Sequence, residues 1–481
     1  LLLLTVIIGY FLVLILISWY TSRKADNDSF FIGNRKSPWY VVAFGMIGAS
    51  LSGVTFISIP GWVGSSQFTY MQMVLGYLVG YFIIANVLMP LYYRLNLTSI
   101  YTYLEERFGK FSYKTGASFF LLSRIIGASF RLFLVANVLQ FTVFKEWGVP
   151  FEITVLVTIV LIWLYTFRGG IKTIVWTDSL QTFSMLLAVI ISVFIIGKQM
   201  DFDFSGMIEL VKESKYSRIW IFDDWKSEYH FFKQFVGGAF IAIVMTGLDQ
   251  DMMQKNLSCK NIGEAKKNMY WMSISLVPVN ILFLSLGALL FIYAQKMNIS
   301  IPEQTDNLFP LIATGGYLPQ VVGVFFIIGL VAAAYSSADS ALTSLTTSFT
   351  IDILEADKKR IENLKKTRIG IHILLSFVLM AVILIFKAIN DENVISAIFT
   401  VAGYTYGPLL GLYAFGLFTK RKVKDRFVPV VAIISPILTY FINLHSEALL
   451  WGYIFGFELI LVNGFFTFLG LQFISRRKKQ I

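Results

Sequence analysis

Six ionisable side chains stand inside segments that are otherwise apolar enough to lie in a membrane. Because a charged group is costly to expose to lipid, such residues face the interior of a helix bundle and are candidates for binding or ion transport. They are Arg124, Arg131, Asp178, Asp249, Asp251 and Asp339.

Hydroxyl side chains gather in two of the same segments. The first group is Ser50, Ser52 and Thr55, after Gly48, and the second is Ser336, Ser337 and Ser340, which share one helix face with Ala333. Oxygen ligands suit a hard cation such as Na⁺, and a broken helix adds backbone carbonyls. Each hydroxyl can instead bond to its own helix, but three serines on one face beside Asp339 favour an ion site.

The two arginines lie seven residues apart on one predicted helix. An unpaired guanidinium at mid-membrane depth, as expected for Arg131, needs a partner, and a carboxylate held by two hydrogen bonds is the natural one. That carboxylate belongs either to a ligand or to a fixed partner, Asp178 or Asp339. Arg124 is nearer the cytoplasm, where its head group can extend to the interface.

The composition identifies the setting that must hold these residues. The chain has 481 residues, of which 56% are hydrophobic and 14% charged, and its mean hydropathy is +0.70. Soluble proteins carry about 25% charged residues, so a soluble enzyme, a nucleic-acid-binding protein and a disordered scaffold are excluded. One cysteine, Cys259, permits neither an intrachain disulfide nor a cysteine metal cluster. An all-α integral membrane protein is predicted.

Apolar runs separated by polar breaks predict thirteen membrane-spanning helices. They are expected at 2–21, 38–58, 67–92, 113–144, 151–168, 173–198, 232–254, 268–295, 317–350, 368–387, 392–418, 426–444 and 449–474. The first run is long enough for a retained span rather than a signal peptide. Residues 199–231 are too short to fold alone and predict an external lid or surface helix.

The basic residues predict the orientation. Most of the 40 lysines and arginines fall in loops after odd-numbered spans or in the tail, so the N-terminus is expected outside and the C-terminus in the cytoplasm. The expected location is the cell's inner or plasma membrane. The net charge of +11 is thus a topology signal, with anionic lipids as partners, and no nucleic acid is expected.

Glycines interrupt two predicted spans. Gly45, Gly48 and Gly53 lie in the second, and Gly237, Gly238 and Gly247 lie in the seventh. Broken helices at matching positions of two halves are typical of inverted-repeat transporters. Close packing of helices through small residues explains the glycines equally well.

Four motifs resemble those of the sodium/solute symporter family, in the right order over roughly residues 30–420. Gly169 to Gln181 resembles its GG-x4-V-W-T-D-x2-Q segment, and Tyr103 to Gly109 its YLE-x-RFG loop. Asp249 and Gln250, with the Glu-Ala pair that follows, resemble its DQ-x3-Q…EA loop, and Ala333 to Ile353 its sodium-site helix. Together they are a specific signal.

The resemblance implies a LeuT-type fold and Na⁺-driven uptake by alternating access. Two inverted repeats of five spans would cover about 38–198 and 232–418, with a peripheral helix at 1–21 and two more at 426–474. Together they would form one transporter domain, and the expected transport unit is a monomer. The implied sodium site uses carbonyls of Gly48, Leu51 and Ala333 and hydroxyls of Ser336 and Ser337. A second sodium in some members implies Asp178, Ser336, Asp339 and Ser340. Asp339 departs from the family's serine, which leaves the stoichiometry open.

The substrate is predicted from residues 51–60, which resemble the sialic-acid branch of that family. In that branch, hydroxyls matching Ser50, Ser52 and Thr55 contact the substrate, and an arginine matching Arg131 takes its carboxylate. Gln72 is a further candidate on the third span. The galactose branch uses amide and carboxylate groups, and the approximately matching positions here, Thr55, Val74 and Ala242, cannot make the same hydrogen bonds. An anionic sugar acid such as sialic acid is therefore favoured over a neutral sugar. Uronates, monocarboxylates and pantothenate-like anions stay open.

Two other classes of function are alternatives. A membrane-embedded enzyme is disfavoured because His230, His372 and His445 are scattered and no nucleophile motif stands beside a base. An ion channel is disfavoured because the chain has no selectivity-filter repeat.

Overall fold

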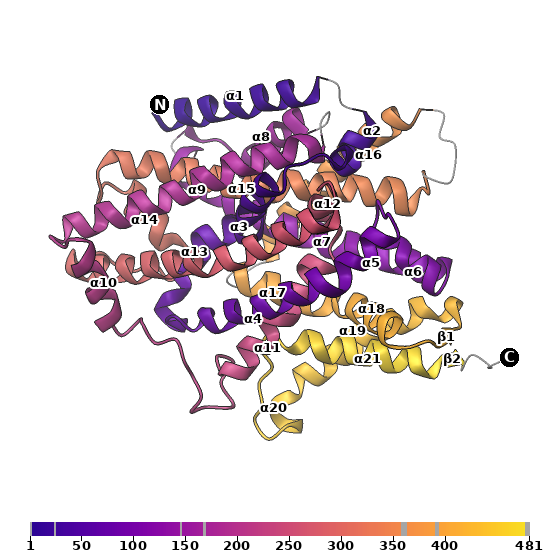
Figure 1. Cartoon of the computed structure of the whole chain (residues 1–481). Coiled ribbons are helices and arrows are strands. Elements are labelled where there is room, and N and C mark those ends of the chain that lie inside the picture. The colour runs from indigo at the N-terminus through magenta and orange to yellow at the C-terminus, as the bar shows by residue number, and fades with distance from the viewer. Residues whose placement is uncertain are drawn as a thin grey trace.

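The computed structural model describes residues 2–23, 26–144, 147–166, 170–356, 363–389 and 394–476, and this part of the chain is almost entirely helical (Figure 1). Gly169 of the predicted motif and the first two residues of the predicted 392–418 span lie outside it. The first half contains α1 (Leu2–Ser22), α2 (Asn27–Ile32), α3 (Trp39–Ser66), α4 (Tyr70–Ile83), α5 (Met89–Arg94), α6 (Thr102–Arg107), α7 (Lys110–Leu139), α8 (Phe151–Thr166), α9 (Ile171–Gln199) and α10 (Phe204–Glu213).

The second half is also built from helices. It contains α11 (Phe231–Ala242), α12 (Gln250–Leu257), α13 (Ile262–Lys296), α14 (Leu308–Thr314), α15 (Gln320–Ser348), α16 (Leu364–Ile389), α17 (Val394–Thr405), α18 (Gly407–Phe418), α19 (Val428–Leu444), α20 (Ser446–Leu449) and α21 (Leu459–Phe473). Two short strands, β1 (Lys422–Val423) and β2 (Ser475–Arg476), pair antiparallel near the C-terminus.

Nine helical segments in the described part are long and apolar enough to cross a membrane. A tenth is the pair Phe231–Gly247 and Gln250–Leu257, bent by 64°. The remaining apolar helices, α8, α18 and α21, are shorter. The multi-pass helical architecture is therefore as predicted, and the count of thirteen crossings stays a prediction.

Several predicted boundaries differ from the structure. Helix α3 continues to Ser66 instead of ending at residue 58, and α13 begins at Ile262 instead of residue 268. The seventh segment does not end at residue 254, because α12 continues to Leu257. The last segment does not begin at residue 449, because Trp451 and Gly452 have positive φ angles of 53° and 85° and α21 starts only at Leu459. Backbone in that region cannot continue a helix.

The most buried spans form the centre of the bundle. Within their apolar windows, 89% of Trp39–Ser66 and 78% of Gln320–Ile353 is buried, and α3, α9, α13 and α15 pack against one another. By contrast, α1 lies at one side of the molecule and α19 and α21 at the other (Figure 1). The central helices carry the hydroxyl residues singled out in the sequence, together with Asp178 and Asp339.

Close packing explains part of the glycine pattern. A Cβ at Gly238 of α11 would collide with the Met73 carbonyl of α4, and one at Gly76 of α4 would collide with the Phe235 carbonyl. These glycines let the two backbones touch. Gly247 instead lies at the bend before α12.

The segment after α9, which the sequence predicts to be external, contains a surface helix followed by a loop. Asp203 caps α10 by accepting the Gly206 N–H at 2.7 Å. The loop is tied to the bundle where the Phe68 N–H donates to the Arg218 carbonyl at 3.1 Å.

Candidate substrate and ion site

Helix α3 is broken at Ser52, within the segment where the sequence predicts unwinding. Ser52 has φ 61° and ψ 174°, a conformation that costs a non-glycine residue about 1–3 kcal/mol. Its hydroxyl accepts the Val54 N–H at 3.3 Å. A Cβ at the next residue, Gly53, would lie 3.0 Å from Val135 and 3.5 Å from the Ala334 backbone. The break is therefore held tightly between α7 and α15.

The second break separates α11 from α12. A π-turn at Ile243–Gly247 ends the first helix, and Asp249 caps the next by accepting the Asp251 N–H at 2.8 Å. The carbonyls exposed at the bend, those of Gly247 and Leu248, accept the hydroxyls of Tyr92 and Tyr101 at 2.8 and 2.9 Å. Both expected interruptions are therefore present.

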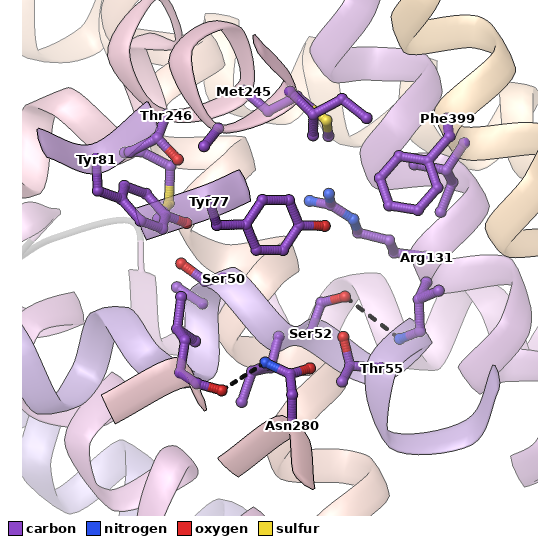
Figure 2. Close-up of a pocket in the computed structure, with 18 of the residues that line it drawn as sticks. Ser50, Ser52, Thr55, Tyr77, Tyr81, Arg131, Met245, Thr246, Asn280 and Phe399 are labelled. Atoms are coloured by element: carbon purple, nitrogen blue, oxygen red, sulfur yellow. Dashed lines mark hydrogen bonds between the residues drawn. The ribbon is translucent and has the colours of Figure 1, made fainter. Parts of the chain in front are cut away.

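A cavity of about 90 Å³ lies beside these breaks (Figure 2). Its polar lining includes Ser50, Ser52, Thr55, Tyr70, Tyr77, Tyr81, Arg124, Arg131, Thr246 and Asn280. Four of the five residues expected to bind substrate, namely Ser50, Ser52, Thr55 and Arg131, are therefore brought together.

Gln72, the fifth, does not line this cavity. Its amide nitrogen donates to the Tyr229 carbonyl at 2.9 Å, and its amide oxygen accepts the Ile221 N–H at 3.2 Å. The side chain is buried and fastens the loop between α10 and α11 to α4, so both of its polar atoms are already engaged.

Arg131 reaches into the cavity toward Tyr77 (Figure 2). Among the described residues no carboxylate forms an ion pair with it, and its buried Nε has no hydrogen-bond partner. The fixed pairing with Asp178 or Asp339 that the sequence left open is absent, because each of those carboxylates has other partners. Arg131 is thus a half-buried cation with its donors directed at the cavity.

The sequence suggested that Arg124 extends to the membrane interface, and the structure shows that it does not. It is 4% exposed and forms ion pairs with Asp251 and, at 3.9 Å, with Asp249. Tyr406 donates to Asp249 and Ser340 donates to Asp251. The two acidic residues at the start of α12 neutralise Arg124, so it differs sharply from Arg131.

A buried ion pair that the sequence did not predict lies between α9 and α12. Lys255 donates to one Asp178 oxygen at 2.6 Å, and Ser336 donates to the other at 2.7 Å. Lys255 is only 1% exposed. One signal was present: Asp178, Asp249, Asp251 and Asp339 outnumber the two arginines, so a further buried cation was needed.

Asp339 is satisfied by neutral donors. The Tyr165 hydroxyl donates to one oxygen at 2.9 Å, and the Ser340 N–H donates to the other at 2.5 Å. The other residues predicted to bind a second sodium also have protein partners. The Ser340 hydroxyl donates to Asp251, and the Ser336 hydroxyl donates to Asp178. These residues form a polar network of two clusters around α15. One joins Asp178 to Ser336 and Lys255, and the other joins Asp339 and Asp251 through Ser340.

The predicted principal sodium set lies where α3 packs against α15. Leu51, Ala333, Ser336 and Ser337 are all buried. Thr182 of α9, which the sequence reading missed, accepts the Gly48 N–H at 3.1 Å and donates to the Gly45 carbonyl at 3.3 Å. Thr182 could have been found from the sequence, because it stands one helical turn after Asp178.

The donor chemistry of this region fits a hard monovalent cation. Carbonyl and hydroxyl oxygens are the ligands that such an ion prefers. Within the described residues, no group of three histidine, cysteine or acidic side chains is arranged to hold a metal ion.

Comparison with known proteins agrees with this architecture. A model of the sodium:solute symporter family matches residues 30–425. The sodium/sialic acid symporter NanT of Aliivibrio fischeri is 28% identical over 87% of this chain and 83% of its own length. SiaT of Proteus mirabilis, also a sodium/sialic acid symporter, is 26% identical over 89% and 88%.

A solved structure supports the fold. The structure of a Na⁺-coupled sialic acid symporter in a substrate-bound outward-open state superposes with a TM-score of 0.83, at 20% identity and over 99% of both chains. The predicted LeuT-type fold is confirmed.

Proposed function

Because the chain belongs to the sodium:solute symporter family, we propose that it imports an anionic sugar acid of the sialic acid type together with Na⁺. The observation that carries the substrate class is Arg131: a guanidinium that faces a cavity without a carboxylate partner. Such a cation in a membrane protein calls for an anion, and the similar proteins NanT and SiaT are named for sialic acid.

The substrate's carboxylate binds Arg131 in this proposal. The fork of the guanidinium can donate two hydrogen bonds to it. The hydroxyls of Ser50, Ser52 and Thr55 line the same cavity and bind polar groups on the remainder of the molecule. Arg124 does not compete for the anion, because Asp249 and Asp251 already neutralise it.

We assign the co-transported Na⁺ to the carbonyls of Gly48, Leu51 and Ala333 and the hydroxyls of Ser336 and Ser337. The α3 break contributes to both sites, since Leu51 stands between Ser50 and Ser52. An ion that joins α3 to α15 therefore also fixes the hydroxyls that face the substrate. This shared segment is the physical link between Na⁺ and substrate binding.

We infer that one Na⁺ accompanies each substrate. A second sodium beside Asp178 would meet the Lys255 ammonium, which lies 2.6 Å from that carboxylate. Two cations at one carboxylate repel each other, so Lys255 takes the role of the second cation. Asp178, Asp339 and Ser340 are then structural members of the network.

The bends on α3 and at the start of α12 are the natural hinges for alternating access. We propose the two inverted repeats at about 38–198 and 232–418 as the moving units of one domain. The proposed transporter acts as a monomer in the inner or plasma membrane, with its N-terminus outside and its C-terminus in the cytoplasm.

Thermal unfolding of the purified protein tests the proposal. N-acetylneuraminate, glucuronate and galactose are each added in NaCl and in choline chloride. We expect N-acetylneuraminate to raise the Tm in NaCl and not in choline chloride, because ligands stabilise the state that they bind. Equal stabilisation by galactose, or stabilisation without Na⁺, contradicts the proposal.

A further inference from the structure

A buried amide on α13 has an oxygen without a hydrogen-bond donor. Asn280 is 1% exposed and lines the cavity. Its Nδ2 donates to the Leu276 carbonyl at 2.7 Å, whereas its buried Oδ1 has no partner among the described residues. An unpaired buried acceptor is destabilising, so its presence at a cavity requires an explanation.

The orientation of this amide is fixed by its own helix. The Leu276 carbonyl only accepts hydrogen bonds, so the amide atom beside it must be the nitrogen. The reverse orientation would place two oxygens 2.7 Å apart. The amide oxygen therefore faces away from Leu276, on the side of Thr55 (Figure 2).

Asn280 and Arg131 offer complementary groups to a ligand. The Arg131 guanidinium donates hydrogen bonds and cannot accept them, whereas Asn280 Oδ1 accepts hydrogen bonds and cannot donate them. The two side chains come from α13 and α7 and enter the cavity from different sides (Figure 2). A ligand that satisfies both must carry an anionic group and, at another position, a hydroxyl or an amide N–H.

We infer that Asn280 is a specificity-determining residue that accepts a hydrogen bond from a hydroxyl or amide N–H of the substrate. The inference rests on the proposed function, since it concerns which organic anions the cavity selects. A short carboxylate without a donor leaves Oδ1 unpaired, and a site with an unpaired buried polar group discriminates strongly against such a ligand. Hydroxylated or acylamino acids are thereby favoured over simple monocarboxylates.

Binding measurements on the full chain in saturating NaCl test this inference. The probes are N-acetylneuraminate, which has hydroxyl and amide donors, and propionate, which has none. The Asn280→Leu variant keeps the side-chain shape and removes the acceptor. We expect it to bind N-acetylneuraminate about tenfold more weakly than the wild type. Propionate should bind no more weakly than to the wild type, because the unpaired acceptor that disfavours it is gone.

Asn463→Leu is a matched control. Asn463 of α21 is also buried with an unpaired Oδ1, and its Nδ2 donates to the carbonyls of Gly403 and Tyr404 at 3.0 and 2.8 Å. It does not line the cavity. Its substitution is expected to leave both affinities unchanged, and Asn280→Ala is measured in the same way if Asn280→Leu does not fold.

The outcomes separate the two proposals. Equal affinity of wild type and Asn280→Leu for N-acetylneuraminate overturns this inference and leaves the proposed function standing. Equal weakening for both probes overturns it too, because the residue is then structural. If the wild type binds neither probe in NaCl, the proposed function falls and the inference with it.

Discussion

The Lys255 ammonium lies 2.6 Å from the Asp178 carboxylate, and each side chain is only 1% exposed. The pair joins α12, directly after the bend, to α9. Removing one partner from a buried pair leaves an uncompensated charge and typically costs about 3–5 kcal/mol. The stability of this protein therefore depends on this contact, and in the proposed function the number of coupled Na⁺ ions depends on it as well.

Replacing Lys255 should expose a latent sodium site. In Lys255→Met the Asp178 carboxylate loses its cation, so we expect a lower Tm in choline chloride and a much larger rise in Tm on adding NaCl than in the wild type. Thermal unfolding across a NaCl titration measures both. The Lys255→Met/Asp178→Asn double variant is the control, and a Na⁺ response in it as large as in the single variant would refute the explanation.

The Arg124 pairing should be structural rather than substrate-binding. Asp251→Asn removes one of two carboxylates near Arg124 and should lower stability by about 3 kcal/mol. Arg124→Met/Asp251→Asn should lose less stability than the sum of Arg124→Met and Asp251→Asn, because each single substitution already removes the Arg124–Asp251 ion pair. Chemical denaturation of the four proteins forms a double-mutant cycle, and additive losses would show that the two residues are not coupled.

Arg131 should need its guanidinium shape as well as its charge. Arg131→Lys keeps a cation but loses the two-pronged geometry, so we expect the affinity for N-acetylneuraminate to fall at least about tenfold. Equilibrium binding in NaCl checks this. Because Arg131 has no ion-pair partner among the described residues, the Tm without ligand should barely change, and a large fall would instead indicate a structural role.

The single cysteine should not react with alkylating reagents in the folded protein. Cys259 lies between α12 and α13, and burial, followed by the nearby Glu264 charge, raises the pKa of its thiol to about 12. Only the thiolate reacts readily, so at pH 7 N-ethylmaleimide should modify Cys259 only after unfolding. Mass spectrometry before and after denaturant checks this.

Because the native Cys259 is unreactive in the folded protein, cysteines introduced one at a time can report which side of the membrane they face. Ser205→Cys on α10 is expected to react with a membrane-impermeant maleimide added to intact cells, whereas Lys365→Cys on α16 should react only after the cells are opened. Both positions are exposed. The opposite pattern would invert the proposed orientation.

The sequence revealed those parts of the site that depend on residue type and local spacing. Ser50, Ser52, Thr55 and Arg131 could be assigned because a polar group in an apolar span must face the bundle. Partners could not be assigned in this way: Lys255 was read as lying beyond its helix, and nothing local shows that Gln72 fastens a loop. Such contacts depend on how distant segments pack, as does the unpaired oxygen of Asn280.

Uptake into proteoliposomes tests the central claim most directly. The protein is reconstituted, and labelled N-acetylneuraminate is followed with an inward Na⁺ gradient, with an equal K⁺ gradient and with a proton gradient in Na⁺-free buffer. We predict concentrative uptake with the Na⁺ gradient only, and its loss in Ser337→Ala at low Na⁺. Concentrative uptake at an unchanged rate without Na⁺ would contradict the account.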